Sequence, residues 1–486
     1  MRPLSPVDAT FLRMESKRTP MHVGALLTFK LPNDAPPEFV QQLAEKMRTR
    51  SFMPEPFGFK LAGGVLSKIS PAWVEAEVDI DYHLRHSALP YPGCERELGQ
   101  LVERLHSHPL DLSRPLWECH LIEGLENSRF AIYFKAHHCA IDGMGAVGMV
   151  NKWLSDDPDS QDGSGPWMLG AKGEDNTTDK KTSLIQRLTK PAKSISKQAV
   201  GLKDLMVGLS KMAQGPDSGA RMALTTPRSL FNKPVSQQRR LGTQMLELAR
   251  IKAISKATKT TSNDVLLAVC GSAIRRYLQE TSPVDESLLA SVPMGLKRSA
   301  GKGGNAVAGF VVPLGTDLED PLQRLQIIHR VTKRSKREIL EMTPVAQQQL
   351  ALLGLSPFVA GQMLGILPKI PPLFNFVVSN VVLSKGPLYL MGAELEAMYP
   401  VSFLFDGYAI NITLVGYNDH VAIGFLGCRE AVPSLQRLAV YTGDALTELE
   451  HRLSDQEQVK PTASKPKETP AESPAKTNAK KEEAIE

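Results

Sequence analysis

The chain lacks the residue patterns that build disulfide frameworks and zinc sites. Its 486 residues include only five cysteines, an odd number, and no two of them form a C-x-x-C pair. The sequence therefore supports neither a disulfide framework nor a zinc knuckle, and the pattern fits a reducing cytoplasm. It also has no H-x-x-x-H spacing and no cluster of histidines and carboxylates at ligand spacing. We therefore expect no metal site.

A strong excess of charge of one sign is also missing. The chain carries 57 basic and 52 acidic residues, which gives a formal net charge of +5 at pH 7. This charge is too small to indicate nucleic-acid binding, and no stripe of basic and aromatic residues stands out. The balance suits an anionic small molecule or a weakly anionic membrane surface.

Long apolar runs are scarce. The first 15 residues contain four charged side chains and no such run, so we expect no secretory signal there. One stretch, residues 350–367, is apolar apart from Ser356 and Gln362 and approaches the length of a membrane-spanning helix. Pro357 interrupts it, so we expect a buried helix or a helix on a membrane surface rather than a span.

Length and composition predict two core domains, because 486 residues exceed one ordinary domain and 42% of them are hydrophobic. Helix and strand signals alternate without strict βαβ order over residues 1–155, which predicts a mixed sheet in this first half. Residues 156–226 are interpreted as a crossover linker with amphipathic helices, and residues 227–452 as the second half. The tail, 453–486, has almost nothing to bury and is predicted to be disordered.

Hydrophobic periodicity predicts the main elements of both halves. Apolar residues recur at helical spacing near residues 39–47, 98–105 and 265–277. The predicted strands are residues 24–31, 116–122, 130–136, 288–294, 307–314, 376–382, 409–415 and 421–425.

The most informative stretch is His137-His138-Cys139-Ala140-Ile141-Asp142-Gly143, which follows an apolar run and precedes a glycine-rich segment. Imidazole is the side chain best suited to move a proton near neutral pH. Where a strand turns into a helix, it is directed out of the sheet toward a site that another part of the chain can complete. Asp142 either caps that helix or takes a salt bridge that fixes the turn. The pattern H-H-x-x-x-D-G therefore predicts a general base on a rigid corner.

Two adjacent histidines at a strand end also have simpler interpretations. Local hydrogen bonds could satisfy both of them without any function. A shared metal ion is a second alternative, but adjacent residues of an extended strand point to opposite faces, so His137 and His138 would not chelate one ion together. By the same alternation, one of the two faces the substrate and the other packs inward.

No protein nucleophile is evident in the sequence. There is no G-x-S-x-G elbow, and Gly301-Lys302-Gly303-Gly304 lacks the rest of a phosphate-binding loop, so we interpret it as a flexible turn. A histidine base without a protein nucleophile suggests direct transfer. In such a reaction the base takes a proton from a hydroxyl or an amine, which then attacks an activated acyl group.

The H-H-x-x-x-D-G motif resembles the signature of the acyl-CoA-dependent acyltransferases shared by chloramphenicol acetyltransferase and the condensation domains of peptide synthetases. From about residue 3 to 450, the chain resembles one branch of that superfamily, the bacterial wax ester synthase/diacylglycerol acyltransferases. The motifs that carry the likeness are residues 3–8 (PLSPVD), 20–24 (PMHVG), 114–118 (RPLWE), 262–265 (SNDV), 292–298, 304–305, 378–381 (VSNV) and 399–411. One departure is residues 382–387 (VLSKGP), where the family usually has P-G-P after S-N-V, so the substrate fit beside this turn stays open.

The resemblance implies an α+β fold of two chloramphenicol-acetyltransferase-like mixed-sheet sandwich halves, with an active-site tunnel between them. It makes His138 the general base and His137 its support. Asp142 would hold the turn, either paired with Arg298 or as a helix cap. Gly143 would let the acyl donor approach the backbone.

Three further site residues are implied on the second half. Asn263 would orient the substrate or the developing oxyanion, with a simple helix cap as the alternative. Ser379 and Asn380 would line the tunnel. Trp117, in the P-L-W motif, is expected in the core rather than at the substrate.

The resemblance implies an O-acyltransferase that moves a long-chain acyl group from acyl-CoA to diacylglycerol, giving triacylglycerol, or to a long-chain fatty alcohol, giving a wax ester. Acyl-CoA would be a co-substrate, with no other cofactor and no acyl-enzyme. The apolar products favour a cytoplasmic protein on the inner membrane or on lipid droplets, without a nucleic-acid partner. An acyltransferase for another alcohol or amine and a non-catalytic lipid-droplet homologue stay open, as do the preferred acceptor, the chain length and the oligomeric state.

Overall fold

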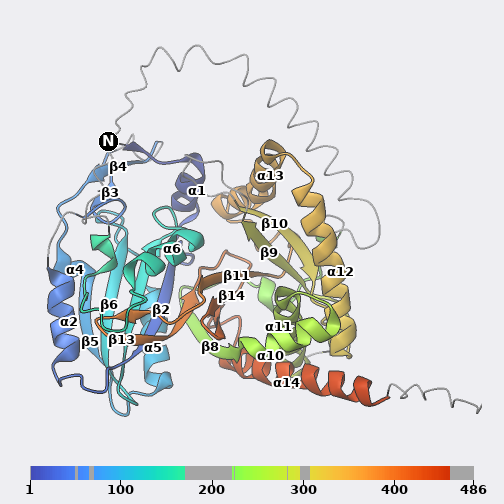
Figure 1. Cartoon of the computed structure of the whole chain (residues 1–486). Helices are drawn as coiled ribbons and strands as arrows, with labels where there is room; N and C mark the ends of the chain where they lie inside the picture. Colours follow the sequence, from blue (N-terminus) through green and yellow to red (C-terminus); the bar gives the residue numbers. More distant parts are fainter. Residues whose placement is uncertain are drawn as a thin grey trace, which may run out of the picture.

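The computed structural model describes residues 2–49, 53–64, 70–169, 222–223, 225–281, 283–295 and 307–459. It is an α+β protein with two six-stranded mixed sheets side by side, each with its own helices (Figure 1). A small third sheet joins β1 (Arg2–Pro3), β4 (Ala72–Glu75) and β3 (Phe59–Leu61). The predicted fold class is therefore confirmed.

The first sheet holds the histidine motif. Its strand order is β12-β13-β2-β7-β6-β5, and only β5 and β6 pair in parallel. The strands are β12 (Tyr389–Leu390), β13 (Ala393–Val401), β2 (His22–Lys30), β7 (Arg129–His137), β6 (Trp117–Leu125) and β5 (Leu84–Ala88). Its helices are α1 (Pro6–Met14), α2 (Phe39–Arg48), α4 (Ile80–His83), α5 (Glu95–Ser107) and α6 (Gly143–Trp153), with a 3₁₀ turn η1 (Pro166–Met168).

The second sheet has the order β10-β9-β11-β14-β15-β8, with β11 parallel to both of its neighbours. The strands are β10 (Val307–Pro313), β9 (Leu289–Gly295), β11 (Phe376–Ser384), β14 (Ile410–Tyr417), β15 (His420–Cys428) and β8 (Arg239–Glu247). The helices are α10 (Leu248–Thr258), α11 (Ser262–Gln279), α12 (Pro321–Leu340), α13 (Pro344–Met363) and α14 (Gln436–Val459), with a 3₁₀ turn η2 (Leu230–Asn232). The helices and strands predicted for the two halves are all present, with ends shifted by a few residues.

The apolar interior is continuous between the two halves. Along β2, Leu27 and Phe29 face one side and pack in a cluster with α2 and α6. Leu26 faces the other side and joins a cluster that contains Leu98 and Val102 of α5 together with the core of the second sheet. This alternation is the two-residue period of a strand buried on both faces.

The chain crosses between the two sheets, which the sequence did not indicate. After β11 in the second sheet, the chain adds β12 and β13 to the edge of the first sheet and then returns to β14. Tyr399 of β13 lies opposite Leu26 of β2. A Cβ atom at Gly424 of β15 would collide with the carbonyl oxygen of Pro400, so glycine permits the close approach of β13 and β15. The contiguous range 227–452 therefore contributes to both sheets.

Helix α13 passes through Pro357, where we expected an interruption. A proline inside a helix has no N–H to donate to the carbonyl four residues earlier, which here belongs to Leu353. The Ser356 hydroxyl donates to that carbonyl at 2.9 Å and so satisfies it. No helix within the described ranges is long and apolar enough to span a membrane.

The tail prediction is wrong for its first seven residues, because α14 continues to Val459. Leu453 packs against the main core, and no proline occurs before Pro461, so nothing stops the helix at 453. Residues 460–486 lie outside the described residues. So does most of the linker, including the amphipathic pattern at 183–214. In the second half, Arg298 and the Gly301–Gly304 turn also lie outside them.

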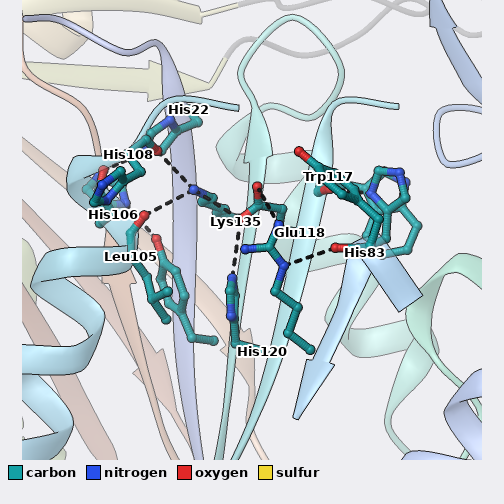
Figure 2. A network of polar contacts seen from close by, with 12 residues as sticks. His22, His83, Leu105, His106, His108, Trp117, Glu118, His120 and Lys135 are labelled. Carbon is teal, nitrogen blue, oxygen red and sulfur yellow. Dashed lines mark hydrogen bonds and ion pairs between the residues drawn. The ribbon is translucent and has the colours of Figure 1, made fainter. Parts of the chain in front are cut away.

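A buried ion pair supports the strand that carries the motif. Lys135 of β7 lies opposite Glu118 of β6, and its Nζ is 3.2 Å from Glu118 Oε2. Lys135 Nζ also donates to the carbonyls of Leu105 (3.0 Å) and His108 (2.9 Å), as Figure 2 shows. Burial alone would raise the pKa of Glu118, but the hydrogen bond from His120 and the Lys135 ammonium outweigh it and lower the pKa to about 2.

We predict that Glu118→Gln destabilises the fold by roughly 3–5 kcal/mol, because it leaves the buried ammonium of Lys135 without its counter-ion. The measurement is denaturant-induced unfolding at pH 7. Glu118 has an ordinary pKa of 4.5 and a folded pKa of about 2, so its contribution is present above pH 4.5 and is lost as the pH falls toward 2. The difference in the free energy of unfolding between Glu118→Gln and the wild type should therefore become smaller as the pH falls from 4.5 toward 2.

Glu123→Gln is the matched control, since Glu123 lies near the end of the same strand with its side chain 37% exposed. It should change the free energy of unfolding by less than about 0.5 kcal/mol. If Glu118→Gln and Glu123→Gln lowered the free energy of unfolding equally, the buried Glu118–Lys135 pair would contribute no more to stability than an exposed carboxylate.

Candidate active site

The two histidines stand where β7 turns into α6. The backbone N–H of His137 donates to Leu116 O (2.9 Å), and that of His138 donates to Met21 O (2.8 Å). The turn that follows is closed by hydrogen bonds from Ala140 and Ile141 to the carbonyl of His137. The motif is therefore the strand–turn–helix corner that the sequence predicted, fixed from both sides by neighbouring segments.

His137 packs inward, and both of its ring nitrogens are used. Its side chain is fully buried. Nδ1 accepts a hydrogen bond from the Cys139 N–H (3.1 Å), so Nε2 is the protonated nitrogen and donates to Glu15 Oε2 at 2.5 Å. An imidazole with no free lone pair cannot remove a proton from a substrate. The predicted supporting role agrees with this geometry.

Glu15 is a site residue that the sequence analysis missed. It is the C-cap residue of α1, and its side chain is only 10% exposed. It lies 122 positions before His137, and no local spacing connects the two. Its only sequence signal is an acid just after a helix that opens the chain.

His138 lies between two aromatic rings. It stacks on Phe11 of α1, with ring centroids 4.0 Å apart, and meets the edge of Phe403 at 5.3 Å. Its Nδ1 is buried and has no hydrogen-bond partner among the described residues, so Nε2 is the nitrogen that can meet a substrate. Burial lowers the pKa of His138 to about 4, against the opposing effect of the Asp142 carboxylate. The ring is therefore neutral at pH 7.

Asp142 is the N-cap of α6. Its Oδ1 accepts a hydrogen bond from the Gly145 N–H at 2.5 Å, which is the cap alternative that the sequence left open. Arg298, the other predicted partner, lies outside the described residues. The carboxylate also acts on Asp8 of α1, whose pKa is raised by burial and by the charge of Asp142. A Cβ at Gly143 would meet no protein atom within 4 Å, so the space beside that backbone is open.

Two of the three predicted residues of the second half contact each other. Asn380 of β11 donates from Nδ2 to Asn263 Oδ1 at 3.2 Å. Asn263 is not the helix cap, because Thr261 caps α11. Ser379, the neighbour of Asn380, is half-buried on β11. The structure therefore brings Asn263 and Asn380 into contact, on a strand that packs against α6.

Helix α6 connects the two clusters. It begins at Gly143, directly after the motif, and Asn151 on its third turn donates to the Leu383 carbonyl of β11 at 2.5 Å. Trp117 is 2% exposed in the core, as predicted, and donates from Nε1 to Phe57 O. Beside it pack Ala140 and Ile141 of the motif, with Phe57 and Leu116. The tunnel itself stays a prediction.

We predict that Glu15→Ala destabilises the protein by about 1–3 kcal/mol, because it leaves the buried Nε2–H of His137 without an acceptor. It should also lower turnover, since the corner that holds His138 loses its anchor. Glu15→Gln retains an acceptor oxygen and should cost less than half as much. Chemical denaturation and thiol release from acyl-CoA measure the two effects. Wild-type behaviour of Glu15→Ala in both assays would show that this contact anchors nothing.

Comparisons with known proteins agree with this arrangement. Residues 4–266 match the wax ester synthase/diacylglycerol acyltransferase catalytic domain, and residues 303–450 match the C-terminal domain of the same family. A putative diacylglycerol O-acyltransferase of Mycobacterium tuberculosis is 51% identical over 453 residues, which cover 93% of this chain and 99% of the relative.

Solved structures show the same likeness. The wax ester synthase/diacylglycerol acyltransferase from Marinobacter aquaeolei VT8 matches with a TM-score of 0.75 and 35% identity, over 93% of this chain and 100% of its own. The first condensation domain of the calcium-dependent antibiotic synthetase matches with a TM-score of 0.58 and 15% identity, over 93% of this chain and 96% of its own. The second match supports the fold alone.

Proposed function

The chain belongs to the wax ester synthase/diacylglycerol acyltransferase family, and we propose that His138 is the general base of this O-acyltransferase. The reaction moves an acyl group from acyl-CoA to the hydroxyl of diacylglycerol or of a long-chain alcohol. One observation carries the assignment of the base. Of the two histidines, His137 has both ring nitrogens in hydrogen bonds, whereas the His138 ring makes no hydrogen bond with the described residues.

In the proposed mechanism, Nε2 of His138 takes the proton of the acceptor hydroxyl as its oxygen attacks the thioester carbonyl. The new C–O bond gives a tetrahedral intermediate, which collapses as the C–S bond breaks. The departing thiolate receives the proton from the imidazolium. The products are the ester and free CoA, with no acyl-enzyme and with acyl-CoA as the co-substrate. The nearby Asp142 carboxylate favours the transient imidazolium.

The Asn263–Asn380 pair is proposed to stabilise the oxyanion or to orient the acyl group. Because Asn263 Oδ1 accepts the hydrogen bond from Asn380, its own NH₂ group is left to donate. A fixed amide donor directed at a developing negative charge is the usual element of an oxyanion site. Ser379 and Gly143 would line the path of the substrates beside it.

Helix α13 is the proposed contact with a lipid surface. It carries no charged residue, and large apolar side chains are exposed along it and just beyond its end: Leu353 (50%), Met363 (55%) and Leu364 (70%). Both classes of acceptor dissolve in membranes or droplets, and each buried methylene is worth about 0.8 kcal/mol. The enzyme would rest on the membrane or droplet that stores its substrates and products.

The first test is His138→Ala. Removal of a general base should lower turnover by roughly a hundredfold to ten-thousandfold, with little change in the unfolding transition. Purified protein is given palmitoyl-CoA with hexadecanol or with diacylglycerol, and thiol release and the lipid products are measured. His420→Ala, at the first residue of β15 and half-buried, is the matched control and should behave as wild type. Near-wild-type thiol release by His138→Ala would exclude the proposed mechanism.

The same assay separates the remaining alternatives. Ester formation only with a different alcohol or an amine would assign another acceptor. No thiol release with any acceptor, from a folded protein, would indicate a non-catalytic lipid-binding homologue.

The lipid-surface proposal has its own test. Leu353→Gln/Met363→Gln/Leu364→Gln should lower partition onto phosphatidylglycerol-containing vesicles tenfold or more in a sedimentation assay, because each side chain loses its transfer free energy into the interface. Tyr91→Gln/Met245→Gln/Val440→Gln is the control, since these exposed apolar residues lie outside α13. Equal partition of the two variants would rule out α13 as the contact.

A further inference from the structure

A cavity lies on the second half, between the start of α11 and one face of α12. Its volume is about 530 Å³, within the range of roughly 300–1,000 Å³ that small-molecule sites occupy. The residues that line it include Thr261, Asp264, Lys333, Lys336 and Arg337. We propose that this cavity binds the phosphorylated nucleotide end of the acyl-CoA donor, a proposal that rests on acyl-CoA being the donor as argued above.

Three cations face this cavity without partners. Lys333, Lys336 and Arg337 are spaced i, i+3 and i+4 along α12, so they lie on one face of the helix. Within the described part of the chain, no carboxylate pairs with any of them, whereas the nearby Arg334 pairs with Glu338 at 2.7 Å. Like charges at this spacing repel one another and destabilise a helix. Phosphate groups in the cavity would remove that repulsion.

Two carboxylates line the cavity beside the three cations. Glu341 is exposed at the C-cap of α12. Asp264 is 1% exposed, and its Oδ2 accepts from the Thr261 hydroxyl (2.7 Å), the Thr261 N–H (3.0 Å) and His329 Nδ1 (2.8 Å).

The other oxygen of Asp264 needs a donor. Oδ1 is buried and accepts no hydrogen bond from the described residues, because the nearby Thr332 hydroxyl, which helps to lower the pKa of Asp264, donates to the Ile328 carbonyl. A buried acceptor without a partner is costly, and a ligand that brings an N–H or O–H group would satisfy it. A nucleotide supplies both requirements, since it has phosphates for the three cations and amino or hydroxyl donors for Asp264. Inorganic phosphate at neutral pH supplies the negative charge but has fewer hydrogen-bond donors for Asp264 than a nucleotide has.

The cavity adjoins Asn263, one of the predicted site residues, because the next residue, Asp264, lines it. Asp264 follows Asn263, which contacts Asn380 of β11, and β11 packs against α6 of the histidine corner. A ligand held by its phosphates at α12 would therefore extend its flexible pantetheine arm past Asn263 toward His138. The second half would bind the nucleotide of acyl-CoA at α11 and α12, and the first half would hold the thioester of the same molecule at His138.

The test compares two donors that differ only in the nucleotide. Lys333→Ala/Lys336→Ala/Arg337→Ala should raise the KM for palmitoyl-CoA at least tenfold with kcat unchanged, and it should leave the kinetics with S-palmitoyl-pantetheine unaltered. Calorimetric titration with free CoA should show the same loss of affinity without turnover. A control variant, Lys252→Ala/Lys256→Ala/Arg429→Ala, removes the same charge from exposed positions elsewhere and should keep the wild-type KM.

Several results would overturn the proposal. One is an unchanged KM for palmitoyl-CoA and an unchanged CoA affinity in Lys333→Ala/Lys336→Ala/Arg337→Ala. Another is an equal rise of KM for palmitoyl-CoA and for S-palmitoyl-pantetheine in that variant. A loss of binding to anionic vesicles with CoA affinity intact would assign the cations to lipid headgroups instead, and binding of inorganic phosphate as tight as that of CoA would exclude nucleotide recognition. Failure of the proposed base would appear differently, as a wild-type kcat in His138→Ala, and calorimetry would still report on the cavity.

Discussion

The geometry of the transfer site depends on one buried side chain, the imidazole of His137. Its Nδ1 holds the Cys139 N–H at the start of the turn, and its Nε2 holds Glu15 at the end of α1. These two bonds join the end of β7, the turn into α6 and the N-terminal helix at one point. Because adjacent strand residues point to opposite faces, fixing His137 inward also fixes His138 outward. A base that must meet a hydroxyl within hydrogen-bond distance needs such a support.

The surroundings of His138 decide the balance between a neutral base and its protonated form. Phe11 and Phe403 cover the ring and exclude water, which lowers its pKa to about 4, while the Asp142 carboxylate acts in the opposite direction. Burial keeps the resting imidazole neutral, and the fixed carboxylate limits the cost of the imidazolium when the proton arrives. Since Asp142 is held by the Gly145 N–H as a helix cap, its charge stays in place through the reaction. The same residue therefore shapes the turn and sets the electrostatics of the base.

Sequence reasoning identified the parts of the site that are local in the chain. The strand end, the turn, the cap and the opposite orientation of the two histidines follow from seven consecutive residues. The fold class and most strands followed from periodicity and from the resemblance. What could not be predicted are contacts across the chain: Glu15 on His137, Phe403 on His138, and the passage of β13 into the first sheet. Each depends on the tertiary path, and β13, which ends in Pro400-Val401, gives only a weak strand signal of its own. The continuity of α13 through Pro357 depends on one serine hydroxyl, a detail below the level of any pattern.

Helix α1 relates the site to the part of the surface proposed to meet lipid. It carries Phe11, which stacks on the base, and it ends at Glu15, which anchors His137. The same helix packs against α13, and Gln362 of α13 donates to Thr19 Oγ1 and accepts from the Asp406 N–H. Arg18, just after α1, forms an ion pair at 2.9 Å with the same Asp406, which lies between β13 and β14. Helix α1 therefore contacts both His138, through Phe11, and α13, the helix proposed to touch the lipid surface. The element that positions the base is thus packed directly against the element proposed to meet the surface in which the acceptors dissolve.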